Sequence, residues 1–200
     1  MWNITLATIK ANLRFIRDTK KPVVCTSFFN SYKVYYVNFR ENLKIVLISM
    51  DLKNLKDYII PFDKFPLHWR FDDESYSKLN QIHLDQIQPI APNAAKFLWE
   101  YSSDIAKKLI NRQNFECFTE INVEDETIKK WLFHRGLAFQ KDIYIVWQPD
   151  TAVITKWKIF VKFFQDFHYF PDDILIFDNS LNWGILIHNG KVIFGSNAYD

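Results

Sequence analysis

The stretch that decides the fold runs from Asp142 to Gly195 and reads DIYIVWQPDTAVITKWKIFVKFFQDFHYFPDDILIFDNSLNWGILIHNGKVIFG. Its beginning, Asp142–Trp147, is rich in β-branched and aromatic residues and predicts a strand. A turn over Gln148–Thr151 follows. Ala152–Phe167 is predicted as a helix, because four large apolar residues fall on one side of it. These residues are Val153, Trp157, Phe160 and Phe164. Asp173–Phe177 then predicts a second strand.

A β-hairpin closes this stretch. Its strands are predicted over Leu181–His188 and Lys191–Gly195, on either side of the pair Asn189-Gly190. Asn-Gly between two apolar runs is the strongest signal for a two-residue type I′ turn. The whole stretch therefore predicts a β-α-β-β-β unit, with a sheet on which helices pack.

The first half of the chain predicts one helix, three strands and an irregular connector. The helix spans Asn3–Lys20, and strands at Val23–Phe29, Tyr32–Phe39 and Lys44–Met50 are expected to pair as an antiparallel meander. The connector, Asp51–Pro92, holds four prolines and several aromatic residues. We expect it to pack onto the rest of the protein rather than to be disordered.

Two more helices are predicted in the middle of the chain. From Asn93 onward, apolar residues repeat at helical spacing as far as Leu109. A second helix is predicted over Val123–Arg135, with three acidic residues in its first turn and Gly136 as a left-handed cap.

The composition suits a folded domain with a large core. The chain has 200 residues, of which 48% are apolar, and it contains 19 Phe, 9 Tyr and 7 Trp but only four Gly. A chain of this length suits one domain. We predict a single α+β domain over residues 1–200, with a mixed, largely antiparallel sheet and packed helices.

Common catalytic and cofactor motifs do not occur in the sequence. The four glycines fit neither a dinucleotide-binding nor a phosphate-binding loop, and there is no GxSxG elbow. The five histidines, at positions 68, 83, 134, 168 and 188, lack metal-ligand spacing. Cys25 and Cys117 do not form a CxxC pair and are expected to be reduced. We therefore predict no cofactor, no metal site and no enzyme.

Charge and hydropathy limit the expected partners. The formal net charge is +2, and no long basic cluster interleaved with aromatic residues predicts nucleic-acid binding. The N-terminal sequence lacks the features of a signal peptide, and no apolar run approaches the length of a transmembrane helix. We expect a cytoplasmic protein that binds neither a membrane nor nucleic acid.

The remaining candidates are acidic residues beside aromatic ones, because aromatic anchors and steering charges are typical of protein interfaces. The candidate partner-binding residues are Tyr169, Asp172, Asp173, Asp178, Trp69, Asp72, Asp73 and Glu74. The alternative interpretation of each acidic cluster is an ordinary turn or a helix start.

Two parts of the sequence resemble each other. His68-Trp69-Arg70-Phe71-Asp72-Asp73 is similar to His168-Tyr169-Phe170-Pro171-Asp172-Asp173, one hundred residues later. Their flanking residues do not match, and this favours a chance likeness.

A pattern of aromatic and acidic residues in the last part of the chain resembles a known family. The residues are Trp157, Phe163-Phe164-x-Asp166-Phe167, Tyr169, Asp172-Asp173, Trp183, His188 and Phe194-Gly195. They look like the C-terminal half of small bacterial immunity proteins, the cytoplasmic antidotes encoded beside polymorphic or contact-dependent growth inhibition toxins.

The resemblance implies a stoichiometric inhibitor that binds a cognate toxin domain and blocks its active site or docking surface. It assigns no catalytic residue. Antidotes of nuclease toxins are usually acidic, whereas this chain is slightly basic, so any such role would depend on local acidic patches. Two alternatives stay open: an enzyme or small-ligand-binding protein whose site is assembled from distant residues, and a general interaction domain.

Overall fold

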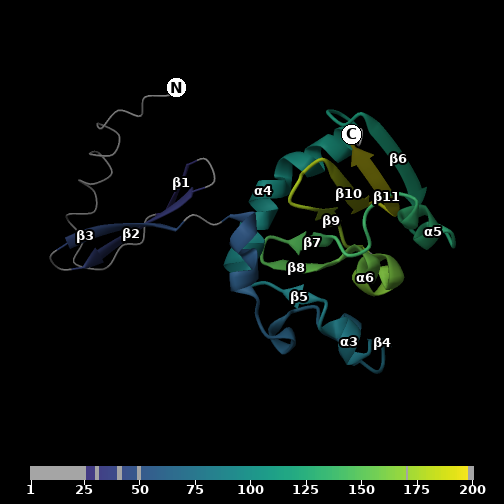
Figure 1. Cartoon of the computed structure of the whole chain (residues 1–200), viewed down its shortest axis with the longest axis horizontal. Helices are drawn as coiled ribbons and strands as arrows, with labels where there is room; N and C mark the ends of the chain where they lie inside the picture. The colour runs from purple at the N-terminus through teal and green to yellow at the C-terminus, as the bar shows by residue number, and fades with distance from the viewer. Residues whose placement is uncertain (1–25, 30–31, 40–41, 49–50, 170, 198–200) are drawn as a thin grey trace. The chain divides into compact units, whose positions relative to one another are not determined.

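The computed structural model describes residues 26–29, 32–39, 42–48, 51–169 and 171–197 (Figure 1). The chain divides into two compact units, Met1–Asp51 and Leu52–Asp200, and each is described by itself. The expectation of one domain over residues 1–200 stays a prediction. The predicted helix Asn3–Lys20 and Cys25 lie outside the described residues.

The first unit contains a three-stranded sheet. Its strands are β1 (Thr26–Phe29), β2 (Tyr32–Phe39) and β3 (Asn42–Ile48), in the order β1-β2-β3. Both pairings are antiparallel, with Thr26 opposite Tyr35 and Phe39 opposite Asn42. The predicted meander is therefore confirmed for these residues.

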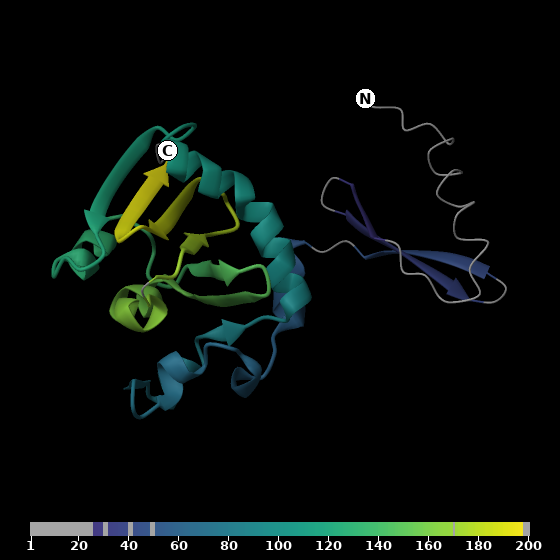
Figure 2. The same ribbon diagram turned by 180° about the vertical axis from the view of Figure 1, so that it is seen from behind.

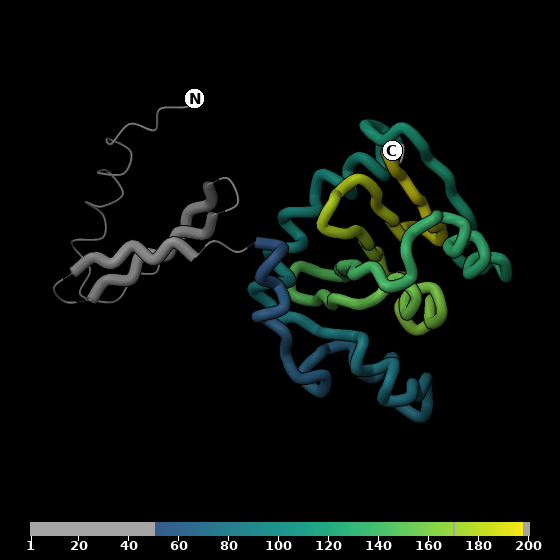
Figure 3. Tube along the Cα trace, in the orientation of Figure 1, coloured from purple at the N-terminus to yellow at the C-terminus, as the bar shows by residue number. Residues whose placement is uncertain are grey.

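The second unit is built on a seven-stranded antiparallel sheet, in the order β5-β8-β7-β9-β10-β11-β6. Figure 3 traces the chain of this unit from Leu52 onward. The strands of this sheet are β5 (Gln88–Pro89), β6 (Cys117–Asn122), β7 (Asp142–Gln148), β8 (Thr151–Lys156), β9 (Ile174–Phe177), β10 (Trp183–His188) and β11 (Lys191–Ser196). With its helices, this sheet confirms the α+β class and the antiparallel pairing.

The helices lie on both faces of the sheet. The longest, α4 (Pro92–Asn111), packs along β7, β8 and β10 on one face (Figure 2). The other face carries the main apolar core, which the shorter helices cover. These are η2 (Phe62–Lys64), α2 (Trp69–Asp72), α3 (Gln81–Leu84), α5 (Ile128–Phe133), α6 (Trp157–Lys162) and α7 (Phe164–Phe167), with the two-residue strand β4 (Ser77–Lys78). The short helix η1 (Leu52–Tyr58) precedes them, and its buried Leu55 is not part of this core.

Successive side chains along β10 point to opposite faces of the sheet. Trp183 and Ile185 point into the main core. Gly184, between them, lies under α4, and a Cβ atom there would come within 2.6 Å of Ile105 Cγ2. Gly195 on the neighbouring strand is equally crowded, because its Cβ would lie 2.7 Å from Phe115. Glycine at these two positions lets the helix approach the sheet closely.

The turn between β10 and β11 has the predicted conformation. Asn189 has φ +50° and Gly190 has φ +72°, and the strands pair from His188–Lys191 outward. Positive φ at both central residues is the mark of a type I′ turn. The Asn-Gly prediction is confirmed.

Proline at this turn should destabilise the protein more than proline at a nearby loop position. Asn189→Pro forces φ to about −65° where the native turn needs a positive value, so we expect a loss of more than about 1 kcal/mol in unfolding free energy. Asn179→Pro is the matched control, since Asn179 is not a positive-φ residue. Thermal melts of both variants check this, and equal melting temperatures would contradict the turn assignment.

The predicted helix over Ala152–Phe167 is wrong in its first part. Thr151–Lys156 forms strand β8, which pairs with β7 on one side and β5 on the other. Its residues Thr151, Ala152, Val153, Ile154 and Thr155 are all buried, as expected for a strand covered on both faces. Helical structure begins only at Trp157, and it is divided into α6 and α7 at Phe163.

The predicted helix over Val123–Arg135 is too long, and the strand before it was not predicted. Residues 117–122 form the edge strand β6, and α5 covers only Ile128–Phe133. Asp125 Oδ1 accepts hydrogen bonds from the Thr127 backbone N–H and hydroxyl, so a turn occupies the place of the first helical residues. Gly136 has φ +72°, in agreement with the predicted left-handed residue after the helix.

The predicted helix from Asn93 and the predicted packing of the connector are also confirmed. The α4 helix begins at Pro92 and buries Leu98, Ile105 and Leu109, although Ser102 rather than Tyr101 takes the buried place between them. The connector packs down, because Phe65 and Phe71 within it are fully buried. Among the described residues, no helix is both long and apolar enough to span a bilayer.

Candidate functional site

Three aromatic rings from two distant parts of the sequence meet on the surface. Trp69 is the first residue of α2, Tyr76 lies in the turn of the short ribbon formed by α2 and β4, and Tyr169 follows α7. The ring of Trp69 packs edge-on against Tyr76 at 5.1 Å and against Tyr169 at 5.9 Å, and the two tyrosines lie 6.1 Å apart. We call these three residues the aromatic patch.

The patch is exposed to solvent. Tyr76 is 41% and Tyr169 is 46% exposed, while Trp69 is half-buried. Rings that touch one another and still face water offer a large apolar area with little conformational freedom to lose. Such rings are typical anchors of protein interfaces.

A buried arginine lies beneath the patch and joins its two segments. Arg70 is 3% exposed, and its Nη2 lies 2.6 Å from Asp172 Oδ2. Its guanidinium carbon is 5.4 Å from the ring centres of both Trp69 and Tyr169. Its Nε and Nη1 have no hydrogen-bond partner in the part of the chain that the structure describes. Asp172 and the two ring faces therefore stabilise this buried charge.

The predicted acidic residues surround the patch, and most have a local partner. His68 Nδ1 lies 3.1 Å from Asp72 Oδ1, and His188 Nδ1 lies 2.8 Å from Asp173 Oδ1. Glu74 pairs with Lys78. Hydrogen bonds from the Ser75 hydroxyl and backbone N–H hold the pKa of Asp73 below its ordinary value. Asp73 and Glu74 are exposed, so these carboxylates form a charged rim.

Burial changes the pKa values of the groups at the contact between the segments. It raises the pKa of Asp166, although a hydrogen bond with Ser77 and the charge of Lys129 act to lower it. It also raises the pKa of Tyr76 and lowers that of His168, which stacks on Phe164. In each case the shift disfavours the charged form, as expected for a partly dry contact.

Asp178 lies apart from the other predicted residues. Its side chain is fully buried, and it accepts hydrogen bonds from Trp183 Nε1 at 2.9 Å and from the Ser180 hydroxyl and backbone N–H. Lys141 Nζ lies 2.5 Å from it. These contacts fix the loop between β9 and β10. Asp178 therefore belongs neither to the aromatic patch nor to its charged rim.

Acid should remove the stabilisation that Asp178 provides. Burial by itself raises the pKa of Asp178, but the contacts with Lys141, Ser180 and Trp183 outweigh it and hold the pKa below its ordinary value. The contribution is therefore complete above about pH 4 and is lost as the pH falls through the folded-state pKa. We expect the Asp178→Asn variant to have a lower melting temperature than the native protein at pH 7. The difference in melting temperature should narrow below about pH 4. A difference in melting temperature that stays constant from pH 7 to below about pH 4 would show that the charge of Asp178 does not stabilise the fold.

Sequence reasoning did not select Arg70 as a site residue, and it named Asp166 only as part of the family resemblance. Nothing in the sequence showed that Trp69 and Tyr169 would touch. One signal was present: the likeness between the segments that begin at His68 and His168, interpreted as chance. Those are the two segments that meet in the patch, with Trp69 and Tyr169 at the corresponding position of each.

Among the described residues, no three metal-ligating side chains lie close enough together to hold a metal ion. Cys117, on β6, is a free and exposed thiol. In comparisons with known proteins, no family model, no curated protein and no solved structure matches this chain.

Proposed function

We propose that this chain is a stoichiometric protein inhibitor, an immunity protein that binds a cognate toxin domain through the aromatic patch and neutralises it. The observation that carries the proposal is the patch itself: three exposed or half-exposed rings from two segments, held over a buried arginine. Anchors that are already ordered before binding lose less entropy when the complex forms.

The charges around the patch favour a basic partner. Residues 68–78 and 166–173 together contain six carboxylates, two histidines and only two lysine or arginine side chains, Arg70 and Lys78, although the chain as a whole has a net charge of +2. Arg70 is buried and Lys78 pairs with Glu74. A local acidic surface steers a basic partner to the patch and speeds association.

The resemblance to immunity proteins gives the proposal its biological class. It rests on Trp157, Tyr169, Asp172-Asp173 and Trp183 among other residues, and of these Tyr169, Asp172 and Asp173 lie at the aromatic patch or its rim. We place the complex in the bacterial cytoplasm, where the resemblance expects an antidote to act, and we propose no catalytic activity.

The test uses the gene that neighbours this one. The C-terminal domain of the large protein encoded immediately upstream is expressed from an inducible promoter, with and without the full chain. We expect this domain to stop growth alone, the chain to restore growth, and the two proteins to purify together at equal stoichiometry. A toxic neighbour that neither binds the chain nor is neutralised by it would overturn the proposal.

A further inference from the structure

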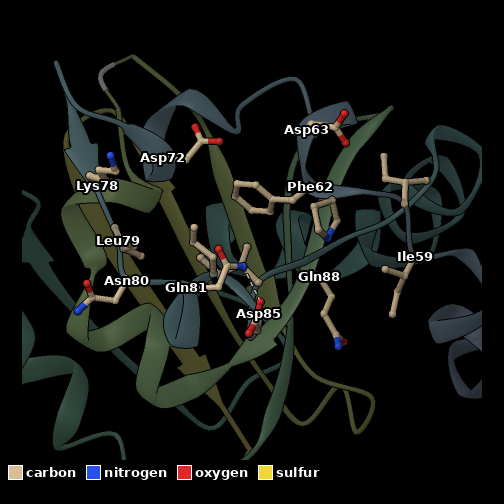
Figure 4. Close-up of a pocket in the computed structure, with 14 residues that line it drawn as sticks. Ile59, Phe62, Asp63, Asp72, Lys78, Leu79, Asn80, Gln81, Asp85 and Gln88 are labelled. Atoms are coloured by element: carbon tan, nitrogen blue, oxygen red, sulfur yellow. Dashed lines mark hydrogen bonds between the residues drawn. The ribbon is translucent and has the colours of Figure 1, made fainter.

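A groove lies next to the α2–β4 ribbon, whose Asp72 and Lys78 form part of its lining. Its volume is about 810 Å³, and it is bounded by residues 59–63 and 78–89 together with Asp72 (Figure 4). Its apolar lining includes Phe62, Leu79, Leu84 and Ile87. None of these apolar side chains is fully exposed, and Ile87 and Leu79 belong to the main core.

The polar lining of the groove is acidic. Figure 4 shows the carboxylates of Asp63, Asp72 and Asp85 around the Phe62 ring. Asp85 accepts a hydrogen bond of 2.7 Å from Gln81 Nε2, and Asp63 is 71% exposed. The basic side chain in the lining is Lys78, which pairs with Glu74 outside the groove. Asp63 Oδ2 lies 3.6 Å from Lys64 Nζ and Asp72 Oδ1 lies 3.1 Å from His68 Nδ1, so two of the three carboxylates have a partner outside the lining. The groove thus combines an apolar floor with three carboxylates and one lysine.

The groove is continuous with the patch through one short segment. Asp72, in the groove wall, is the last residue of the helix that begins at Trp69. The ribbon is held by bridges from Asp72 to Lys78 and from Asp73 to Ser77. A partner that covers the aromatic patch therefore lies beside the mouth of the groove.

We propose that the groove takes a lysine or arginine side chain, together with an adjoining apolar residue, from an extended segment of the partner protein. This inference rests on the proposed function and adds the chemistry of the partner. A long basic side chain lays its methylene groups on an apolar floor and keeps its charge at a polar rim. The face of Phe62 and the surrounding carboxylates suit that charge.

The experiment tests the groove with a defined probe and no toxin. The full chain, labelled at isoleucine and leucine methyl groups, is titrated with a short capped peptide of alternating leucine and lysine. The same peptide with glutamate in place of lysine is the ligand control. We expect the lysine peptide to shift the methyl signals of Leu79, Leu84 and Ile87, and the glutamate peptide to shift none of them.

Two double variants separate a local site from a general charge effect. Asp63→Asn with Asp85→Asn should weaken binding of the lysine peptide about tenfold or more, because close charge pairs at the site are lost. Glu124→Gln with Glu126→Gln changes the net charge equally at exposed positions elsewhere and should leave the affinity unchanged. Equal weakening by both double variants, or no methyl shifts in the groove, would overturn the proposal.

Growth rescue and peptide binding give separate outcomes. If the chain neutralises its toxin but does not bind the lysine peptide in the groove, the proposed function is supported and the groove proposal is wrong. If the chain binds the peptide in the groove but neutralises no toxin, the proposed function is wrong. The assignment of the groove to a toxin segment is then wrong as well.

Discussion

Replacing Trp183 with alanine is expected to lower the free energy of unfolding by about 3–5 kcal/mol, the cost of removing a large aromatic side chain from a packed core. Trp183 is fully buried, packs edge-on against Trp157 at 6.0 Å and stacks on Phe194 at 6.3 Å. Its Nε1 also donates a hydrogen bond to the buried carboxylate of Asp178. The substitution thus opens a cavity and removes a donor from a buried charge. Urea denaturation measures the loss.

Trp183→Phe separates the two effects. Phenylalanine keeps an apolar ring in the core but cannot donate to Asp178, so we expect a smaller loss of about 1–3 kcal/mol. Together the two variants test the place of β10 in the core. An alanine variant that unfolds at the same urea concentration as the native protein would contradict the core assignment.

Replacing Arg70 with methionine is the second substitution with a large expected effect. Methionine retains an apolar stem but leaves Asp172 without its cation, and breaking a buried pair from one side costs about 3 kcal/mol or more. Since Arg70 also lies against the rings of Trp69 and Tyr169, its removal should loosen the aromatic patch and weaken partner binding. Denaturation curves and affinity for the partner give the two readouts.

An exposed arginine serves as the matched control. Arg112 pairs with Glu120 but has a side chain that is 56% exposed, so Arg112→Met should change stability by less than about 1 kcal/mol. The double variant Arg70→Met with Asp172→Leu removes both charges and should recover part of the stability that the single variant loses. Equal effects of Arg70→Met and Arg112→Met would show that the charge of Arg70 is not buried.

Local signals in the sequence predicted those parts of the fold that depend on neighbouring residues. The turn at Asn189-Gly190 needs only positive φ at two adjacent positions, and the α4 helix needs only its own apolar face. The segment Thr151–Lys156 is different. Its apolar residues fit a helix or a buried strand equally well, and pairing with β7 and β5 decides between them. That pairing is not visible in the segment itself.

The same limit applies to the site. Sequence reasoning selected Trp69 and Tyr169 separately as aromatic residues beside acids, but their contact depends on how α2 and α7 pack. It also could not separate Asp178, which is fully buried, from the exposed Asp73, because both stand in acidic and aromatic surroundings. Burial of Arg70 was hidden for the same physical reason: it results from the meeting of two segments.

The most direct test of the proposed interface is the dissociation rate of the complex with the cognate toxin domain. Tyr169→Ala removes an exposed anchor of the patch, and we expect dissociation to become about thirtyfold faster, which corresponds to about 2 kcal/mol. Phe139→Ala is the control: Phe139 is 49% exposed and its ring packs on Phe133, outside the patch. Its variant should dissociate at the native rate. If a folded Tyr169→Ala variant also dissociates at the native rate, the aromatic patch is not the surface that binds the toxin.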